Sequence, residues 1–204
     1  MMVRNPNLPE ITWSPQEEAT ATGLVMETLR IARARTIQEA LTFSAAELGF
    51  DSFVFGIVAN DRRPDAESRT YVITDQVDTW VRMYDERAYL ELDPRVELAS
   101  EPGYSFWEAR QFDKNPGHKV FLKEAGENGI QSGLVIGLCT RDPPSYAMLS
   151  FNRAAPTLQR WTAEQRLFIA GQASMLGKVL SRTVRRYLNE QELVFPAPPM
   201  KLNN

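Results

Sequence analysis

Residues 133–140 read Gly-Leu-Val-Ile-Gly-Leu-Cys-Thr and residues 146–151 read Tyr-Ala-Met-Leu-Ser-Phe, with Arg-Asp-Pro-Pro-Ser at 141–145 between them. Both runs are short, apolar and rich in β-branched or aromatic residues, as is typical of strands, and the prolines between them favour a turn. The stretch therefore predicts two neighbouring strands. Adjacent strand pairs build an antiparallel sheet, whose apolar faces must be covered by helices.

The remaining elements are predicted from hydrophobic spacing and capping signals. Two further strands are expected at Ser52–Ala59 and Arg69–Thr74, with a polar loop between them. Helices are expected from Ser14-Pro15, from Thr36 to Gly49 behind the capping box Thr36-x-x-Glu39, at Gln76–Leu90, from Asp93-Pro94, at Trp107–Phe112, at His118–Asn128 and at Thr162–Leu188. The predicted fold class is α/β: an α/β/α sandwich with a central antiparallel sheet of about five strands, the fifth not placed.

Length and composition indicate one folded domain. The chain has 204 residues, 43% of them hydrophobic and 24% charged, as in ordinary globular proteins. We expect a flexible segment at 1–13, the domain at 14–190, and a disordered tail or truncated linker at 191–204. No apolar run is long enough for a membrane span, and the N-terminus has no signal-peptide core. A single cysteine excludes an internal disulfide, so a cytoplasmic location is expected.

The charge distribution leaves two interpretations open. The net charge of −3 argues against direct nucleic-acid binding by this chain. Residues 153–204, however, carry eight basic and three acidic residues, a net charge of +5. This basic stretch is either the solvated face of the last helix or a contact with an acidic partner or with DNA phosphates.

A catalytic or metal site is not indicated by the sequence. Nucleophilic catalysis by Cys139 would require a base, and the only histidine is His118. Cys139 follows the apolar run 134–138, which predicts a buried, inert thiol. One histidine and one cysteine cannot build a zinc site, and no phosphate-binding glycine loop is present. We therefore expect no enzyme activity and no cofactor.

A binding pocket is better supported, because residues 71–112 hold 8 of the 20 aromatic residues. Trp80 and Tyr84 are four residues apart and share a helix face. Plain core packing would give the same pattern. Asp93 also has two interpretations. It is either the N-cap of a helix with Pro94 at its first position, or a carboxylate that faces the pocket and needs a hydrogen-bond donor there.

These residues carry a resemblance to a known family. The pattern Trp80-x3-Tyr84-x4-Tyr89-x3-Asp93-Pro94, followed by Tyr-Ser-Phe-Trp at 104–107, resembles the autoinducer-binding domain of LuxR-type quorum-sensing receptors. Residues 128–136 and 147–151 are similar to two later strands of that domain. The resemblance extends over roughly residues 20–190.

The resemblance implies an acyl-homoserine lactone in a pocket between sheet and helices. Trp80 would donate its indole N–H to the lactone carbonyl, and Asp93 would accept a hydrogen bond from the ligand amide. The remaining positions implied to lie near the ligand are Tyr84, Tyr89 and Trp107 as walls, and Ser150 as a hydroxyl.

The sequence departs from the family pattern at three points. Gln76 stands where the family usually has a tyrosine that contacts the ligand's amide carbonyl. Gly137 stands where it usually has a proline. LuxR-type receptors also continue into a helix-turn-helix domain of about 60 residues, whereas 14 residues, 191–204, follow the predicted domain here. The chain is thus expected to be a single-domain protein or one truncated at its linker.

Three functions follow as hypotheses. The first is a lactone-binding regulator that dimerises through Thr162–Leu188 and acts through a LuxR-type partner receptor or by sequestering the signal; the same domain could also be the sensor half of a DNA-binding factor. The second is a ligand-independent interaction module that forms inactive heterodimers with such receptors, motivated by Gln76. The third, a lactone-degrading enzyme, lacks both a metal-ligand cluster and a nucleophile–base pair.

Overall fold

The predicted α/β/α sandwich is confirmed. We describe a computed structural model of the protein, which covers residues 2–4, 36–61, 69–112, 114–141, 144–190 and 193–194. Its central antiparallel sheet has five strands in the order β3 (Arg69–Thr74), β2 (Ser52–Asp61), β8 (Ala147–Arg153), β5 (Ser132–Gly137) and β4 (Gly103–Glu108).

Four short strands complete the description. β1 (Met2–Arg4), within the segment expected to be flexible, pairs parallel with β3, and β9 (Leu193–Val194) pairs with the end of β2. β6 (Thr140–Arg141) and β7 (Pro144–Ser145) form a small separate hairpin at the turn predicted between β5 and β8.

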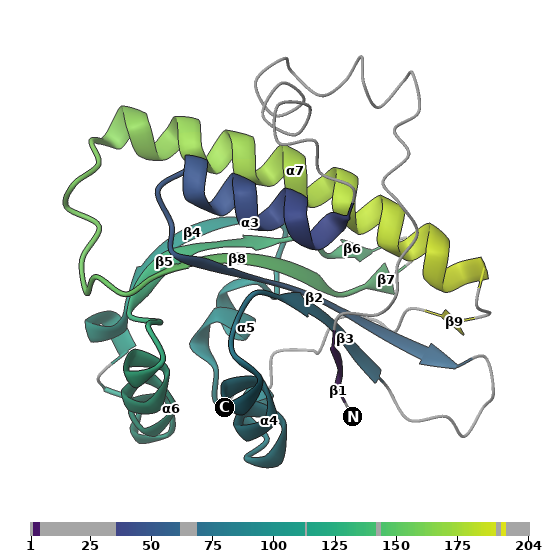
Figure 1. Cartoon of the computed structure of the whole chain (residues 1–204), viewed down its shortest axis with the longest axis horizontal. Helices are drawn as coiled ribbons and strands as arrows, with labels where there is room; N and C mark the ends of the chain where they lie inside the picture. Colours follow the sequence, from purple (N-terminus) through teal and green to yellow (C-terminus); the bar gives the residue numbers. More distant parts are fainter. Residues whose placement is uncertain are drawn as a thin grey trace.

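Helices cover both faces of the sheet (Figure 1). One face carries α3 (Ile37–Glu47) and the long α7 (Ala163–Glu190). The opposite face carries α4 (Asp78–Glu86), α5 (Pro94–Leu98) and α6 (Pro116–Glu127), with short 3₁₀ turns at Tyr89–Glu91 and Ala109–Phe112. The two helical layers thus have separate cores, and the layer with α4 and α5 holds the predicted site.

Local sequence signals predicted α3 where the structure has it. The Thr36 hydroxyl accepts a hydrogen bond from the Glu39 backbone N–H at 3.1 Å, and the Glu39 carboxylate accepts one from the Thr36 N–H at 3.1 Å. This reciprocal capping box satisfies two N–H groups that the helix itself cannot pair. Gly49 follows the helix with a φ of +82°, a conformation that favours glycine. The helix predicted from Ser14-Pro15 lies outside the described residues.

The prediction of a helix at Trp107–Phe112 is wrong for its first two residues. Residues 103–108 form β4, the fifth strand that the sequence alone did not place, and only Ala109–Phe112 is helical, as a 3₁₀ turn. β4 pairs with β5 along its length, from Gly103 opposite Gly137 to Glu108 opposite Ser132. Tyr104, Phe106 and Trp107 are residue types that favour strands, and β5 supplies the hydrogen-bond partners of this edge strand.

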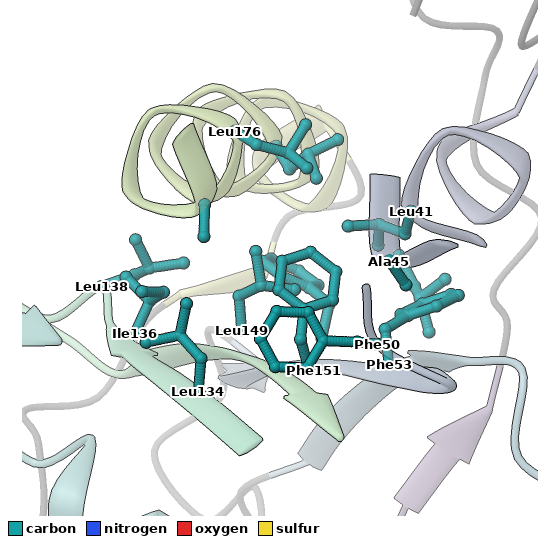
Figure 2. Packing of buried hydrophobic residues seen from close by; sticks show 14 of the residues in the cluster. Leu41, Ala45, Phe50, Phe53, Leu134, Ile136, Leu138, Leu149, Phe151 and Leu176 are labelled. Carbon is teal, nitrogen blue, oxygen red and sulfur yellow. The ribbon is translucent and has the colours of Figure 1, made fainter. Parts of the chain in front are cut away.

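Side chains alternate between the two faces of the sheet. Figure 2 shows Phe53 of β2 and Leu149 and Phe151 of β8 in the core beneath α3 and α7. The residues between them face the other way: Gly56 lies opposite Met148 and Val54 opposite Ser150 in the β2–β8 register. Because the strand period is two, the sequence that builds one core also builds the floor beneath α4 and α5.

Candidate functional site

A pocket lies between the sheet and the layer formed by α4, the 3₁₀ turn at 89–91 and α5. The volume open to the centre of a water molecule is about 60 Å³, which is room for several waters at roughly 10–15 Å³ each. The sheet side is lined by the strand residues Val54, Gly56, Val58, Thr70, Val72, Thr74 and Met148, and by Tyr146 just before β8. The opposite wall is lined by Gln76, Trp80, Val81, Tyr84, Leu90, Asp93, Arg95 and Val96. Apolar walls with a few polar groups suit an amphipathic ligand.

Trp80 and Tyr84 form the aromatic wall of this pocket, as their spacing predicted. Their ring centres are 6.1 Å apart in an edge-on arrangement on one face of α4. Tyr89 and Phe121 extend the cluster, with ring-centre distances of 5.3–6.1 Å among the four rings. The indole N–H of Trp80 makes no hydrogen bond to any residue that the structure describes. It is therefore available as a donor.

Asp93 is the N-cap of α5, as one of its two interpretations predicted, and it also lies among the pocket-lining residues. One carboxylate oxygen, Oδ1, accepts the backbone N–H of Arg95 at 2.9 Å and caps α5. The Arg95 guanidinium donates its Nε–H to Oδ1 at 3.0 Å and an Nη2–H to Oδ2 at 2.7 Å. Tyr84 donates its hydroxyl to Oδ2 at 3.0 Å. The carboxylate therefore already has donors from the protein.

Arg95 joins this pair to the sheet. Its side chain is 2% exposed, and Nη1 donates to Oδ1 of Asn152 on β8 at 2.8 Å. Asn152 in turn donates to the hydroxyl of Ser52, which also accepts the side-chain amide of Gln76. A continuous chain of hydrogen bonds thus runs from Tyr84 on α4 to Gln76, and it passes through Asn152 and Ser52, which are not among the pocket-lining residues.

Burial and charge keep these groups in defined protonation states. Burial, reinforced by the negative charge of Asp93, raises the pKa of the Tyr84 hydroxyl well above its ordinary value, so the phenol stays protonated and donates. Desolvation alone would lower the pKa of Arg95, but the charge and hydrogen bonds of Asp93 outweigh it and raise that pKa. The Arg95 guanidinium is therefore charged at neutral pH.

The structure does not bring all the predicted residues to the pocket. Gln76, Trp80, Tyr84 and Asp93 line it together. Tyr89 is buried behind Trp80 and donates its hydroxyl to Glu124 at 2.6 Å.

Trp107 and Ser150 also lie behind the lining. Trp107 is fully buried beside the Arg95 guanidinium, 5.7 Å from its ring centre, and its indole N–H has no hydrogen-bond partner in the described part of the chain. Ser150 is fully buried and donates to Asn152 at 2.8 Å. These side chains therefore support the pocket from behind.

Sequence reasoning missed Arg95, Tyr146 and Asn152. Tyr146 lines the pocket and donates its hydroxyl to the backbone carbonyl of Val96 at 3.0 Å. Asn152 shares a strand face with Ser150 and Met148, which the two-residue period could have indicated. Arg95 carried a weaker signal, because a charged residue two positions after an N-cap aspartate is usually a solvent-exposed helix residue.

Neither candidate for nucleophilic chemistry is placed for catalysis. Cys139 is buried, its thiol donates to the Ala99 carbonyl at 3.1 Å, and burial raises its pKa. His118 lies on α6, edge-on to Phe112. Among the described residues, no group of three or more His, Cys, Asp or Glu side chains is placed to hold a metal ion. No helix in the described ranges combines the length and apolarity needed to cross a membrane.

Comparison with known proteins gives a family match and similar solved structures. The model of the family described as "Autoinducer binding domain" matches residues 33–183. CepR2 from Burkholderia cenocepacia, an N-acylhomoserine lactone dependent LuxR family transcription factor, is similar with a TM-score of 0.61 and 22% identity over 84% of this chain and 98% of that one.

Two structures of SdiA show the same fold. SdiA from Escherichia coli is similar with a TM-score of 0.59 and 18% identity over 88% of this chain and 72% of that one. SdiA in complex with octanoyl-rac-glycerol has a TM-score of 0.62 and 16% identity over 95% of this chain and 75% of that one. No curated protein sequence matches the chain.

Proposed function

Because this chain belongs to the autoinducer binding domain family, we propose that it is an acyl-homoserine-lactone-binding quorum-sensing regulator. The observation that carries the proposal is the pocket, in which Trp80, Tyr84 and Asp93 meet beneath an apolar sheet floor. The similar structures include a lactone-dependent factor and a complex with octanoyl-glycerol. Both ligands join an acyl chain to a polar head, and this pocket offers surfaces for both parts.

Within this proposal the pocket residues have distinct roles. Trp80 donates its unused indole N–H to the lactone carbonyl, and Tyr84 forms the wall beside it. The acyl chain lies over the strand residues Val54, Val72 and Met148. Gly56, which has no side chain, lines the same side of the pocket. Gln76, held by Ser52, takes the position that a tyrosine has in relatives, so we expect an acyl preference of its own.

Thermal unfolding against a panel of acyl-homoserine lactones tests the proposal. A ligand at 100 times its dissociation constant stabilises the fold by about 2.7 kcal/mol, which is a rise in Tm of roughly 5–11 °C for a domain of this size. In Trp80→Phe the lost hydrogen bond, worth about 0.5–1.5 kcal/mol, is expected to weaken binding roughly 2- to 10-fold, as measured by isothermal titration calorimetry.

Trp161→Phe is the matched control, because Trp161 lies in the opposite core beside Phe50 and Phe106. We expect it to leave the affinity unchanged. If wild type and Trp80→Phe bind every lactone with equal affinity, the assignment of Trp80 to the binding site is wrong. Absence of any thermal shift in a folded, ligand-free protein would favour the ligand-independent interaction module instead.

We further propose that the chain dimerises through α7, with itself or with a LuxR-type receptor, and so acts through a partner or by sequestering the signal. Leu167 and Phe168 on this helix are 63% and 53% exposed. Large apolar side chains side by side on a surface mark an interaction site more often than single ones do. The basic residues Arg182 and Arg186 lie further along the same helix and are exposed.

Sedimentation velocity tests this interface. Phe168→Asp is expected to shift a dimer toward monomer by at least tenfold in the dissociation constant, since burying an unpaired carboxylate is unfavourable. Val120→Asp introduces the same charge at an exposed apolar position of α6 and should leave the equilibrium unchanged. If both variants sediment like the wild type, or if the wild type is monomeric alone and with the receptor, the α7 interface is wrong.

A further inference from the structure

The acceptor capacity of Asp93 is already filled by the protein. A carboxylate offers about four lone-pair sites. Oδ1 accepts the Arg95 backbone N–H and Nε–H at 2.9 and 3.0 Å, and Oδ2 accepts an Arg95 Nη2–H and the Tyr84 hydroxyl at 2.7 and 3.0 Å. The Asp93 side chain is 1% exposed. A ligand N–H could therefore reach Asp93 only by displacing one of these donors.

Arg95, in contrast, has donors to spare. A guanidinium carries five N–H groups. One Nε–H and one Nη2–H bond Asp93, and one Nη1–H bonds Asn152. Two N–H groups, one on each terminal nitrogen, have no acceptor among the described residues. Arg95 lines the pocket, and its position is fixed by the flanking rings of Phe121 and Trp107 at 5.6 and 5.7 Å.

The polar wall of the pocket thus presents donors and no open carboxylate acceptor. Trp80 and Arg95 both line the pocket, and the Trp80 indole N–H and two Arg95 N–H groups have no acceptor among the described residues. A ligand that carries acceptor oxygens would satisfy such donors. An ion pair held by three direct bonds between guanidinium and carboxylate and packed between rings is also costly to open, because each charge would be left buried and unpaired.

We propose that Arg95 is a specificity-determining residue that recognises the carbonyl of the ligand's acyl linkage, and that an N–H on that linkage is not required. The ligand class is then an acyl chain joined to a small oxygen-rich head group by either an amide or an ester. This inference rests on the proposed function, because it concerns the ligand of the same pocket. Asp93 is in this arrangement a positioning residue for Arg95 and Tyr84.

A matched pair of ligands tests the inference without any mutation. An N-acyl-homoserine lactone and the O-acyl ester of α-hydroxy-γ-butyrolactone with the same chain differ only by N–H against O. We expect their dissociation constants for the wild-type protein to agree within about threefold. A hydrogen bond from an N–H to a charged acceptor would instead favour the amide by about tenfold or more, and that result would overturn the inference.

Two variants extend the test to the residues involved. Tyr84→Phe removes one donor from Oδ2 of Asp93 and opens an acceptor site, so the amide is expected to gain at least threefold over the ester. Arg95→Lys retains the charge but loses the fork geometry, and both ligands should weaken together by about three- to tenfold. An unchanged amide-to-ester ratio in Tyr84→Phe, or unchanged affinities in Arg95→Lys, would contradict the assignment.

The outcomes separate this inference from the proposed function. If the amide binds and the ester binds clearly more weakly, the proposed function as a lactone-binding regulator is supported and the role of Arg95 is contradicted. If neither ligand binds at any chain length, both the proposed function and the role of Arg95 are contradicted. If the amide and the ester bind with equal affinity, the proposed function and the role of Arg95 are both supported.

Discussion

Replacement of Arg95 by methionine is expected to lower the free energy of unfolding by about 3–5 kcal/mol, because it leaves the Asp93 carboxylate buried without its counter-charge. The two side chains are 2% and 1% exposed, so water cannot screen the remaining charge. Urea unfolding with linear extrapolation measures the loss.

A double-mutant cycle separates charge from packing. Asp93→Asn combined with Arg95→Met removes both charges, and the pair of substitutions should be clearly more stable than Arg95→Met alone. Arg82→Met is the control, since the Arg82–Glu86 pair on α4 is 70% and 67% exposed and contributes little. If Arg95→Met is no more destabilising than Arg82→Met, the buried ion pair does not organise this wall.

Replacement of Gly137 by alanine is expected to destabilise the fold by roughly 3 kcal/mol, at the upper end of the range for an inserted methyl group. A Cβ at this position would lie 2.0 Å from the carbonyl oxygen of Glu101 and 2.9 Å from that of Ala99. Both contacts are with backbone, which cannot move aside without disturbing the start of β4. The same contacts give a physical reason for glycine at this position.

Gly171→Ala is the matched control for this substitution. Gly171 lies within α7, and a Cβ there has no neighbour within 4 Å. Alanine at a helix-interior position should stabilise the protein by about 1 kcal/mol. In urea unfolding, we expect Gly137→Ala to lower the free energy of unfolding and Gly171→Ala to raise it. A Gly137→Ala protein as stable as the wild type would mean that residues 99–101 do not approach β5 so closely.

Much of the fold could be predicted because its signals are local. Thr36 and Glu39 form their capping box within one helical turn, and Asp93 caps α5 through its own backbone neighbourhood. The runs at 52–59, 69–74 and 146–151 are strands because β-branched and aromatic residues cluster there. The strand at 103–108 also contains aromatic residues, but its place at the edge of the sheet depends on pairing with β5.

In the candidate site, too, some positions followed from local spacing and others depended on the tertiary structure. Helical spacing alone determined that Trp80 and Tyr84 share a face, and both line the pocket. Sequence spacing could not show that Trp107 and Ser150 lie one layer behind it, because that depends on which strands are neighbours. Their distance from the pocket is set by β8 and β5 lying side by side.

Thus the sequence by itself determined the strand and helix signals, the caps and the family pattern around Trp80 and Asp93. Only the tertiary structure decided that the Asp93–Arg95 pair is buried and that Arg95 reaches Asn152, 57 residues further along the chain. The physical reason is the range of the interactions. Capping and periodicity act within a few residues, whereas the burial of a charged pair and its contact with a distant strand depend on which elements the sheet brings together.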